Sequence, residues 1–201
     1  SDSCEFGALY PTLNQRILSG KYQVIILDTP GIKTSATKCF NASAIGKPTF
    51  PHSFVGYVSD AIVIPCQPSV YDRKGSIDYY IQLESFLNEM AFKKMRGEFS
   101  YKMLLSQVDH SNDKSVLETM NIFDANGINY YNSHFRTSEK YKNSVKEDSY
   151  ETFFTINNAV GKFEEFKDIV MDVFKDLNEA KLKDEFLSSQ ESALSQRTVA
   201  E

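Results

Sequence analysis

Short apolar runs that alternate with longer amphipathic stretches constrain the fold of this chain more than any other feature. The clearest runs span 22–28, 60–66 and 100–108, and a weaker one spans 127–131. They are rich in β-branched residues and nearly continuously apolar, which is typical of strands buried on both faces of a parallel sheet. The alternation therefore predicts an α/β fold, doubly wound around a mainly parallel sheet.

Amphipathic stretches predict the helices, because their apolar residues recur at intervals of three or four positions and so share one face. Pro11 is expected in the first turn of the first helix, where its missing N–H is harmless. Residues 1–187 are predicted to form one domain, and the polar tail 188–201 is expected to fray. The predicted helices span 11–19, 72–90, 111–123, 137–145 and 163–177.

Residues 29–58 fit neither pattern. They combine several glycines and prolines with Ser, Thr and Lys, and they offer few apolar anchors. A loop of this length inside a compact domain is either functional or disordered. We therefore expect a long loop or insertion that is mobile or that switches with a ligand.

Composition narrows the class of protein. The 201 residues suffice for one domain, and the net charge of −5 excludes a strongly basic, histone-like protein. The cysteines Cys4, Cys39 and Cys66 are odd in number and form no CxxC pair, which favours reduced thiols in the cytoplasm. No apolar stretch approaches the roughly 20 residues that a membrane helix needs, so we expect no membrane partner.

The segment 24–31, VIILDTPG, is the strongest single motif. A buried strand that ends in Asp28 would place a carboxylate at the carboxyl edge of a parallel sheet, where α/β folds bind ligands. Such a carboxylate suits Mg²⁺, which prefers oxygen ligands and retains several waters. Alternatively, Asp28 caps the turn that follows, as aspartate often does.

The order of these segments resembles the ParA/MinD family of partition ATPases. Family members carry a strand that ends in Asp-Thr/Ser-Pro, then a strand of the type ADxxLIPxxPxxxD, then a strand that ends near Asn/Thr-x-x-Asp. The matching positions here are 28–30, 60–72 and 106–109, and 135–154 resembles the segment before the family's last helix. The resemblance covers most of the chain and implies a P-loop NTPase-like fold of the ParA/MinD type.

The family's glycine-rich P-loop is absent from the sequence. None of the Gly-Lys pairs at 20–21, 46–47 and 161–162 is followed by Ser or Thr, so none can cradle phosphates in the P-loop manner. The chain opens at Ser1 without an initiator Met, and we expect the family's first strands and its P-loop to precede it. The alternative is a relative that lost the P-loop and serves as a non-enzymatic interaction module.

The resemblance implies ATP and Mg²⁺ as cofactors, and both would require the missing portion. Asp28 would orient the Mg²⁺ shell, so it is the implied metal residue. Catalysis of phosphoryl transfer to water is mostly positioning and charge neutralisation. The other implied nucleotide-binding residues are a γ-phosphate switch, Thr29, Pro30 and Gly31, and, on the adenine side, Ser106 and Asp109.

The family also implies DNA segregation as the function. Members dimerise with ATP, bind DNA without sequence preference, and respond to a centromere-binding ParB-type partner; counterion release would supply the DNA affinity. Such a protein would be cytoplasmic or associated with the nucleoid. The DNA-binding candidates are the basic residues Arg136, Lys140, Lys142 and Lys146. Alternatively, these residues form only the solvated face of a helix.

Overall fold

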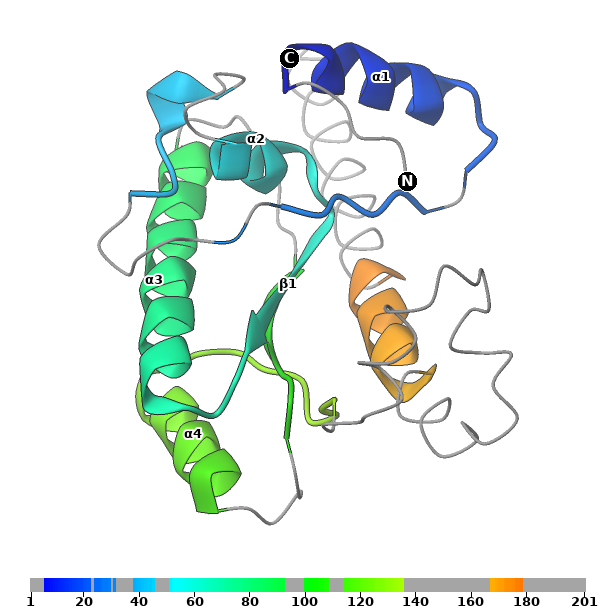
Figure 1. The fold of residues 1–201 in the computed structure, drawn as a ribbon. Coiled ribbons are helices and arrows are strands. Elements are labelled where there is room, and N and C mark those ends of the chain that lie inside the picture. Colours follow the sequence, from blue (N-terminus) through cyan, green and yellow to red (C-terminus); the bar gives the residue numbers. More distant parts are fainter. Residues whose placement is uncertain are drawn as a thin grey trace, which may run out of the picture. The chain divides into compact units, whose positions relative to one another are not determined.

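The computed structural model describes just over half of the chain. The described residues are 6–22, 24–29, 31, 38–45, 51–92, 100–108, 114–135 and 167–178. The elements in order are helix α1 (Phe6–Leu18), a 3-10 turn (Ala42–Ala44), α2 (Pro51–Val58), β1 (Ala61–Cys66), α3 (Val70–Phe92), β2 (Ser100–Leu105) and α4 (Lys114–Ala125). Residues 167–178 form a further helix, drawn in orange in Figure 1.

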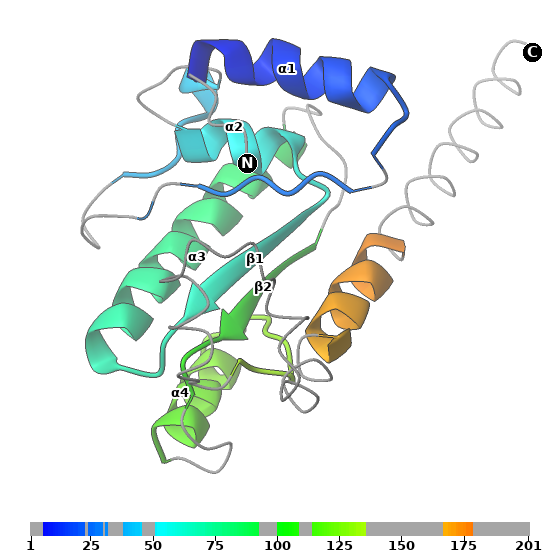
Figure 2. The same ribbon diagram turned by 45° about the vertical axis from the view of Figure 1, so that its right-hand side comes forward.

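Strands β1 and β2 pair in parallel, from Ala61 opposite Ser100 to Cys66 opposite Leu105. Figure 2 shows the two strands side by side. Met103 extends the ladder on the other side of β2, where it forms a parallel bridge with Tyr130. The Met103 N–H donates to the Asn129 carbonyl at 2.8 Å, and the Tyr131 N–H donates to the Met103 carbonyl at 2.9 Å. The described sheet is therefore parallel, as predicted.

The long helix α3 connects β1 to β2, which is the crossover that parallel neighbours require. Ser69 caps its start: the Ser69 Oγ accepts from the Asp72 N–H at 3.2 Å. The first backbone bond runs from the Arg73 N–H to the Ser69 carbonyl at 3.0 Å. The predicted helix over 72–90 is confirmed, with ends two residues further out on each side.

The chain contains two compact units. The first contains the described residues up to Ser59 together with α3 from Ile77 onward, and the second contains β1, the start of α3 and everything from β2 onward. Helix α3 contributes residues to both units. The single domain expected over 1–187 stays a prediction.

An aromatic cluster forms part of the core of the first unit. Phe40 lies 5.1 Å from the Tyr79 ring and 5.3 Å from the Phe86 ring, centroid to centroid, and His52 packs edge-on against Tyr79 at 5.3 Å. Helix α2 approaches this cluster through Gly56. A Cβ at that position would lie 3.0 Å from Phe86 and 3.3 Å from Phe40. Glycine is therefore the residue that permits this approach.

One cluster of the second unit's core lies between the sheet and the helix at 167–178. Leu104, Tyr131 and Ile169 are buried together, and the partly buried Val63, Phe135 and Val173 pack against them. The predicted helical pattern over 163–177 is confirmed for the residues described. Residues 114–125 also confirm most of the predicted helix over 111–123.

The predicted strand at 22–28 is wrong for the residues described there. Residues 22 and 24–28 have no strand assignment, and alternate side chains that should be buried are open to solvent. Val24 is 46% exposed and Ile26 is 87% exposed. A β-branched run raises strand propensity, but a strand also needs a partner, and the described residues provide none for this segment.

The long loop expected at 29–58 contains regular structure. Asn41 caps the 3-10 turn, since its Oδ1 accepts from the Ser43 N–H at 3.0 Å, and Pro51 opens α2 at the position that tolerates proline. Phe54 is only 3% exposed, so the segment does have an apolar anchor. The parts at 32–37 and 46–50 lie outside the described residues, as does the predicted helix at 137–145.

Pro11 lies inside α1 rather than in its first turn, because the helix begins at Phe6. Its ring removes one backbone hydrogen bond from the helix interior, at a cost of about 3 kcal/mol in an exposed helix. Among the described residues, no helix is both long enough and apolar enough to cross a bilayer.

Candidate functional site

The carboxyl edge of the sheet is the place where an α/β fold of this type binds ligands. Both strands end in register there, at Cys66 and Leu105. One further hydrogen bond, from the Ser106 N–H to the Cys66 carbonyl at 2.9 Å, joins the two segments where they leave the sheet. Ser106, an implied nucleotide-binding residue, follows β2 at this edge and is half-buried.

The chain after β1 forms a tight turn into α3. Proline stands next to last in β1, as expected for a residue that cannot donate to the ladder, and its carbonyl accepts from the Ser76 Oγ at 3.2 Å. Three residues before Ser76, the Arg73 Nη1 donates to Thr119 Oγ1 at 3.2 Å. The first turn of α3 itself is open: Val70 is 68% exposed and Tyr71 is 91% exposed.

The chain after β2 contains a strained residue. Gln107 has a φ of +56°, in the left-handed region that non-glycine residues rarely adopt. Backbone bonds on both sides hold it there: the Phe135 N–H donates to the Leu105 carbonyl at 2.9 Å, and the Val108 N–H donates to the Phe135 carbonyl at 3.0 Å. Such strain persists only where the surrounding structure fixes it, and it often accompanies functional positions.

Cys66 at the end of β1 is not an activated nucleophile. Its side chain is 1% exposed, and burial raises the pKa of the thiol to about 11, although the Ser76 hydroxyl and the Arg73 charge partly oppose this. The thiol is therefore protonated at neutral pH, whereas the thiolate is the reactive form. Burial also raises the pKa of Cys39.

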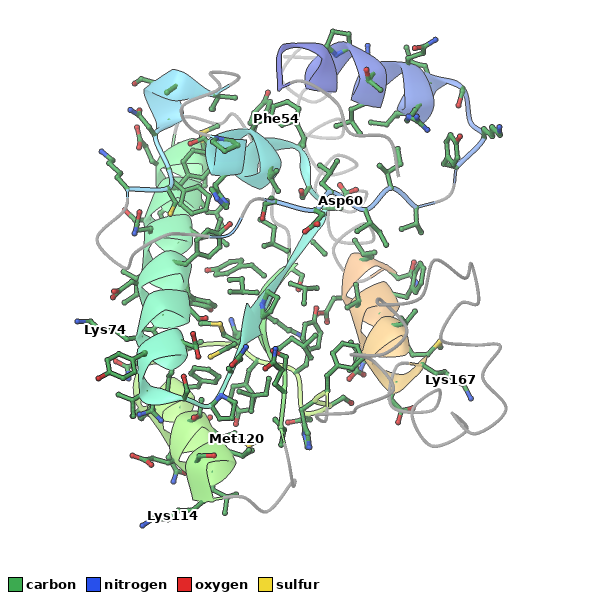
Figure 3. The ribbon with its side chains drawn as sticks, viewed as in Figure 1. Phe54, Asp60, Lys74, Lys114, Met120 and Lys167 are labelled. Atoms are coloured by element: carbon green, nitrogen blue, oxygen red, sulfur yellow. The ribbon has the colours of Figure 1, made fainter. Side chains whose placement is uncertain are left out.

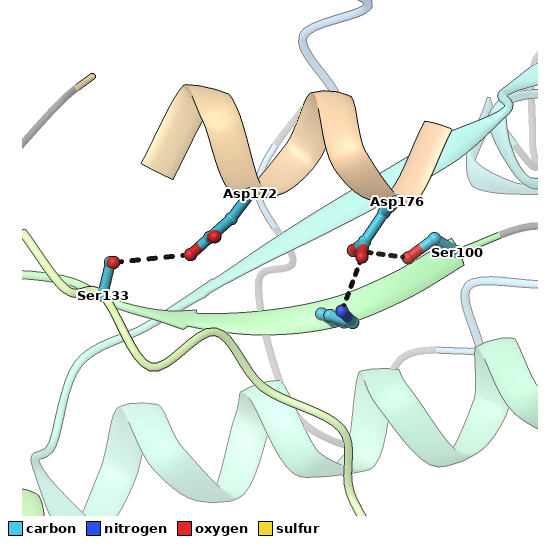
Figure 4. A network of polar contacts seen from close by, with 5 residues as sticks. Ser100, Ser133, Asp172 and Asp176 are labelled. Carbon is cyan, nitrogen blue, oxygen red and sulfur yellow. Dashed lines mark hydrogen bonds and ion pairs between the residues drawn. The ribbon is translucent and has the colours of Figure 1, made fainter. Parts of the chain in front are cut away.

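A network of polar contacts connects the helix at 167–178 to β2 (Figure 4). The Lys102 Nζ lies 2.8 Å from Asp176 Oδ1, and the Ser100 Oγ donates to Asp176 Oδ2 at 3.0 Å. The same ammonium lies 5.2 Å from the centroid of the Tyr131 ring. Burial, together with the charge of Asp176, raises the pKa of Tyr131. Asp176 thus pairs with both Lys102 and Ser100 and holds the helix against β2, whereas the buried Tyr131 hydroxyl has no hydrogen-bond partner among the described residues.

The remaining predicted site residues are placed as follows. Asp28 and Gly31 are exposed and Thr29 is partly buried, all in the first unit, whereas Ser106 belongs to the second. Within the described part of the chain, no group of three or more His, Cys, Asp or Glu side chains could hold a metal ion. The other predicted residues lie outside the described ranges: Pro30, Asp109, Arg136, Lys140, Lys142 and Lys146.

The first unit contains an open cleft of about 480 Å³ that sequence reasoning missed. One wall is the segment 38–42, and the other is the face of α3 that carries Gln82 and Glu89. The Cys39 N–H donates to Gln82 Oε1 at 2.9 Å and joins the two walls. Phe40 and Phe86 line the cleft but are each about 95% buried, so they offer it little apolar surface. No local pattern marks this cleft, because its walls are distant in the sequence.

Comparisons with protein-family models, with curated proteins and with solved structures find no match to this chain.

Proposed function

We propose that this chain acts in the partition of plasmid or chromosomal DNA, as a ParA-like protein that dimerises with ATP and binds DNA without sequence preference. In this proposal a ParB-type centromere-binding protein is its partner. The protein would be cytoplasmic and would associate with the nucleoid through DNA.

The observation that carries the proposal is the parallel β1–α3–β2 unit. The sequence of this unit includes the matching segment 60–72, and the parallel pairing is the arrangement that the resemblance requires. It brings Ser106 and the Ser69–Asp72 cap to the same edge of the sheet, where ligands of α/β proteins bind. The strained Gln107 beside Ser106 adds to this support.

The 201 residues by themselves do not fit a complete ATP–Mg²⁺ site. They contain no glycine-rich turn with the GK[ST] ending that cradles phosphates. Asp28 is an exposed carboxylate, a group that can hold Mg²⁺ together with phosphates, but it does not end a strand of the described sheet, so the placement that suggested its metal role is not met. We therefore derive no hydrolytic step and propose ATP dependence only for a protein in which a phosphate-binding turn accompanies these residues.

The test compares the 201-residue chain with the protein expressed from its complete gene. We expect the complete protein to double its mass in light scattering with ATP but not with ADP, and to bind random-sequence duplex DNA only as that dimer. The 201-residue chain should bind no ATP. A complete protein whose mass and DNA affinity are the same with and without ATP would overturn the proposal.

The second candidate function is a non-enzymatic ParA-like interaction module. The observation that favours it is that none of the three Gly-Lys pairs in the sequence has the Ser or Thr of a P-loop. It predicts that the complete protein captures its partner equally well with ATP, with ADP and without nucleotide. The same light-scattering measurement, repeated with the partner protein, separates the two functions.

A further inference from the structure

We draw no further inference here: the strongest candidate, the surface patch at the end of α1 and along the segment that follows it, where Leu18, Val24 and Ile26 are exposed, carries none because nothing in the structure shows what covers it.

Discussion

Lys102 and Asp176 lie 74 positions apart in the sequence, yet their Nζ and Oδ1 atoms are 2.8 Å apart. The pair joins β2 to the helix at 167–178, and the Asp176 side chain is only 11% exposed. Removing one partner of a largely buried pair leaves the other charge without compensation, which costs more than the pair itself contributes. The stability of the second unit should therefore depend on Asp176.

We expect Asp176→Ala to lower the free energy of unfolding by about 1–3 kcal/mol, since Lys102 remains partly hydrated. Urea denaturation measures this. The matched control is Asp168→Ala, an exposed carboxylate on the same helix, which should change stability by less than about 0.5 kcal/mol. The double variant Lys102→Met with Asp176→Leu should recover most of the loss. Equal losses of stability in Asp176→Ala and Asp168→Ala would contradict the role of the ion pair.

Two helical glycines should respond to alanine in opposite directions. At Gly56 the new Cβ would lie 3.0 Å from Phe86, so Gly56→Ala should destabilise the protein by about 1–3 kcal/mol despite alanine's higher helix propensity. At Gly75 in α3 the new Cβ would meet nothing within 4 Å beyond its chain neighbours and the helix's own backbone, so Gly75→Ala should stabilise by up to about 1 kcal/mol. Thermal unfolding of both variants provides the measurement. An unchanged melting temperature for Gly56→Ala would show that the aromatic rings move to accommodate the Cβ at no cost in stability.

Backbone strain at Gln107 predicts a stabilising substitution. Glycine adopts a φ of +56° without a Cβ penalty, so Gln107→Gly should raise the free energy of unfolding by about 0.5–1 kcal/mol. The converse control is Gly127→Ala, at a φ of +65°, which should lower it by about 1 kcal/mol. Urea denaturation of both variants provides the comparison. If Gln107→Gly were destabilising, the side chain itself would have to contribute more than the strain costs.

The sequence predicted β1, β2, α3 and α4 because their signals are local. Continuous apolar runs mark the strands, and apolar residues that recur every three or four positions mark the helices. The segment at 22–28 carries the same kind of run, but strand formation depends on a partner, which the run does not specify. Helix α2 was missed for the opposite reason: glycine and proline suggested a loop, whereas Pro51 opens the helix and Gly56 allows its close packing.

The candidate site was predictable only in part. Ser106 follows a strong strand signal, so its place at the carboxyl edge could be inferred. The strain at Gln107 and the link from Cys39 to Gln82 could not, because both depend on contacts between segments distant in the sequence. The Lys102–Asp176 pair was equally hidden, since each residue alone looks like an ordinary surface charge.

Stability should fall at alkaline pH through Cys66. Its thiol has a pKa of about 11 in the folded protein, above the roughly 8.5 of an unfolded thiol. The stabilisation, about 3 kcal/mol at roughly 1.4 kcal/mol per pKa unit, is therefore fully present below pH ~8.5 and is lost as the pH rises through the folded pKa. Urea denaturation from pH 7 to 10.5 should show a flatter decline for Cys66→Ala than for the parent. Parallel declines would assign the alkaline loss to other groups, such as Tyr79 and Tyr131, whose pKa values burial also raises.

Asp28 provides the sharpest test of the proposed magnesium role. Its side chain is exposed and makes no hydrogen bond to another described residue, so Asp28→Ala should change stability by less than about 0.5 kcal/mol. In the complete protein, however, it should abolish ATP turnover, because Mg²⁺ would lose a ligand that aligns it with the phosphates. The matched control is Asp60→Ala, an exposed carboxylate at the amino end of β1 (Figure 3), which should leave turnover unchanged. Steady-state phosphate release across a Mg²⁺ titration measures both variants. Turnover of Asp28→Ala within about threefold of the parent, or an equal loss in Asp60→Ala, would remove the assignment, since threefold corresponds to only about 0.7 kcal/mol of barrier.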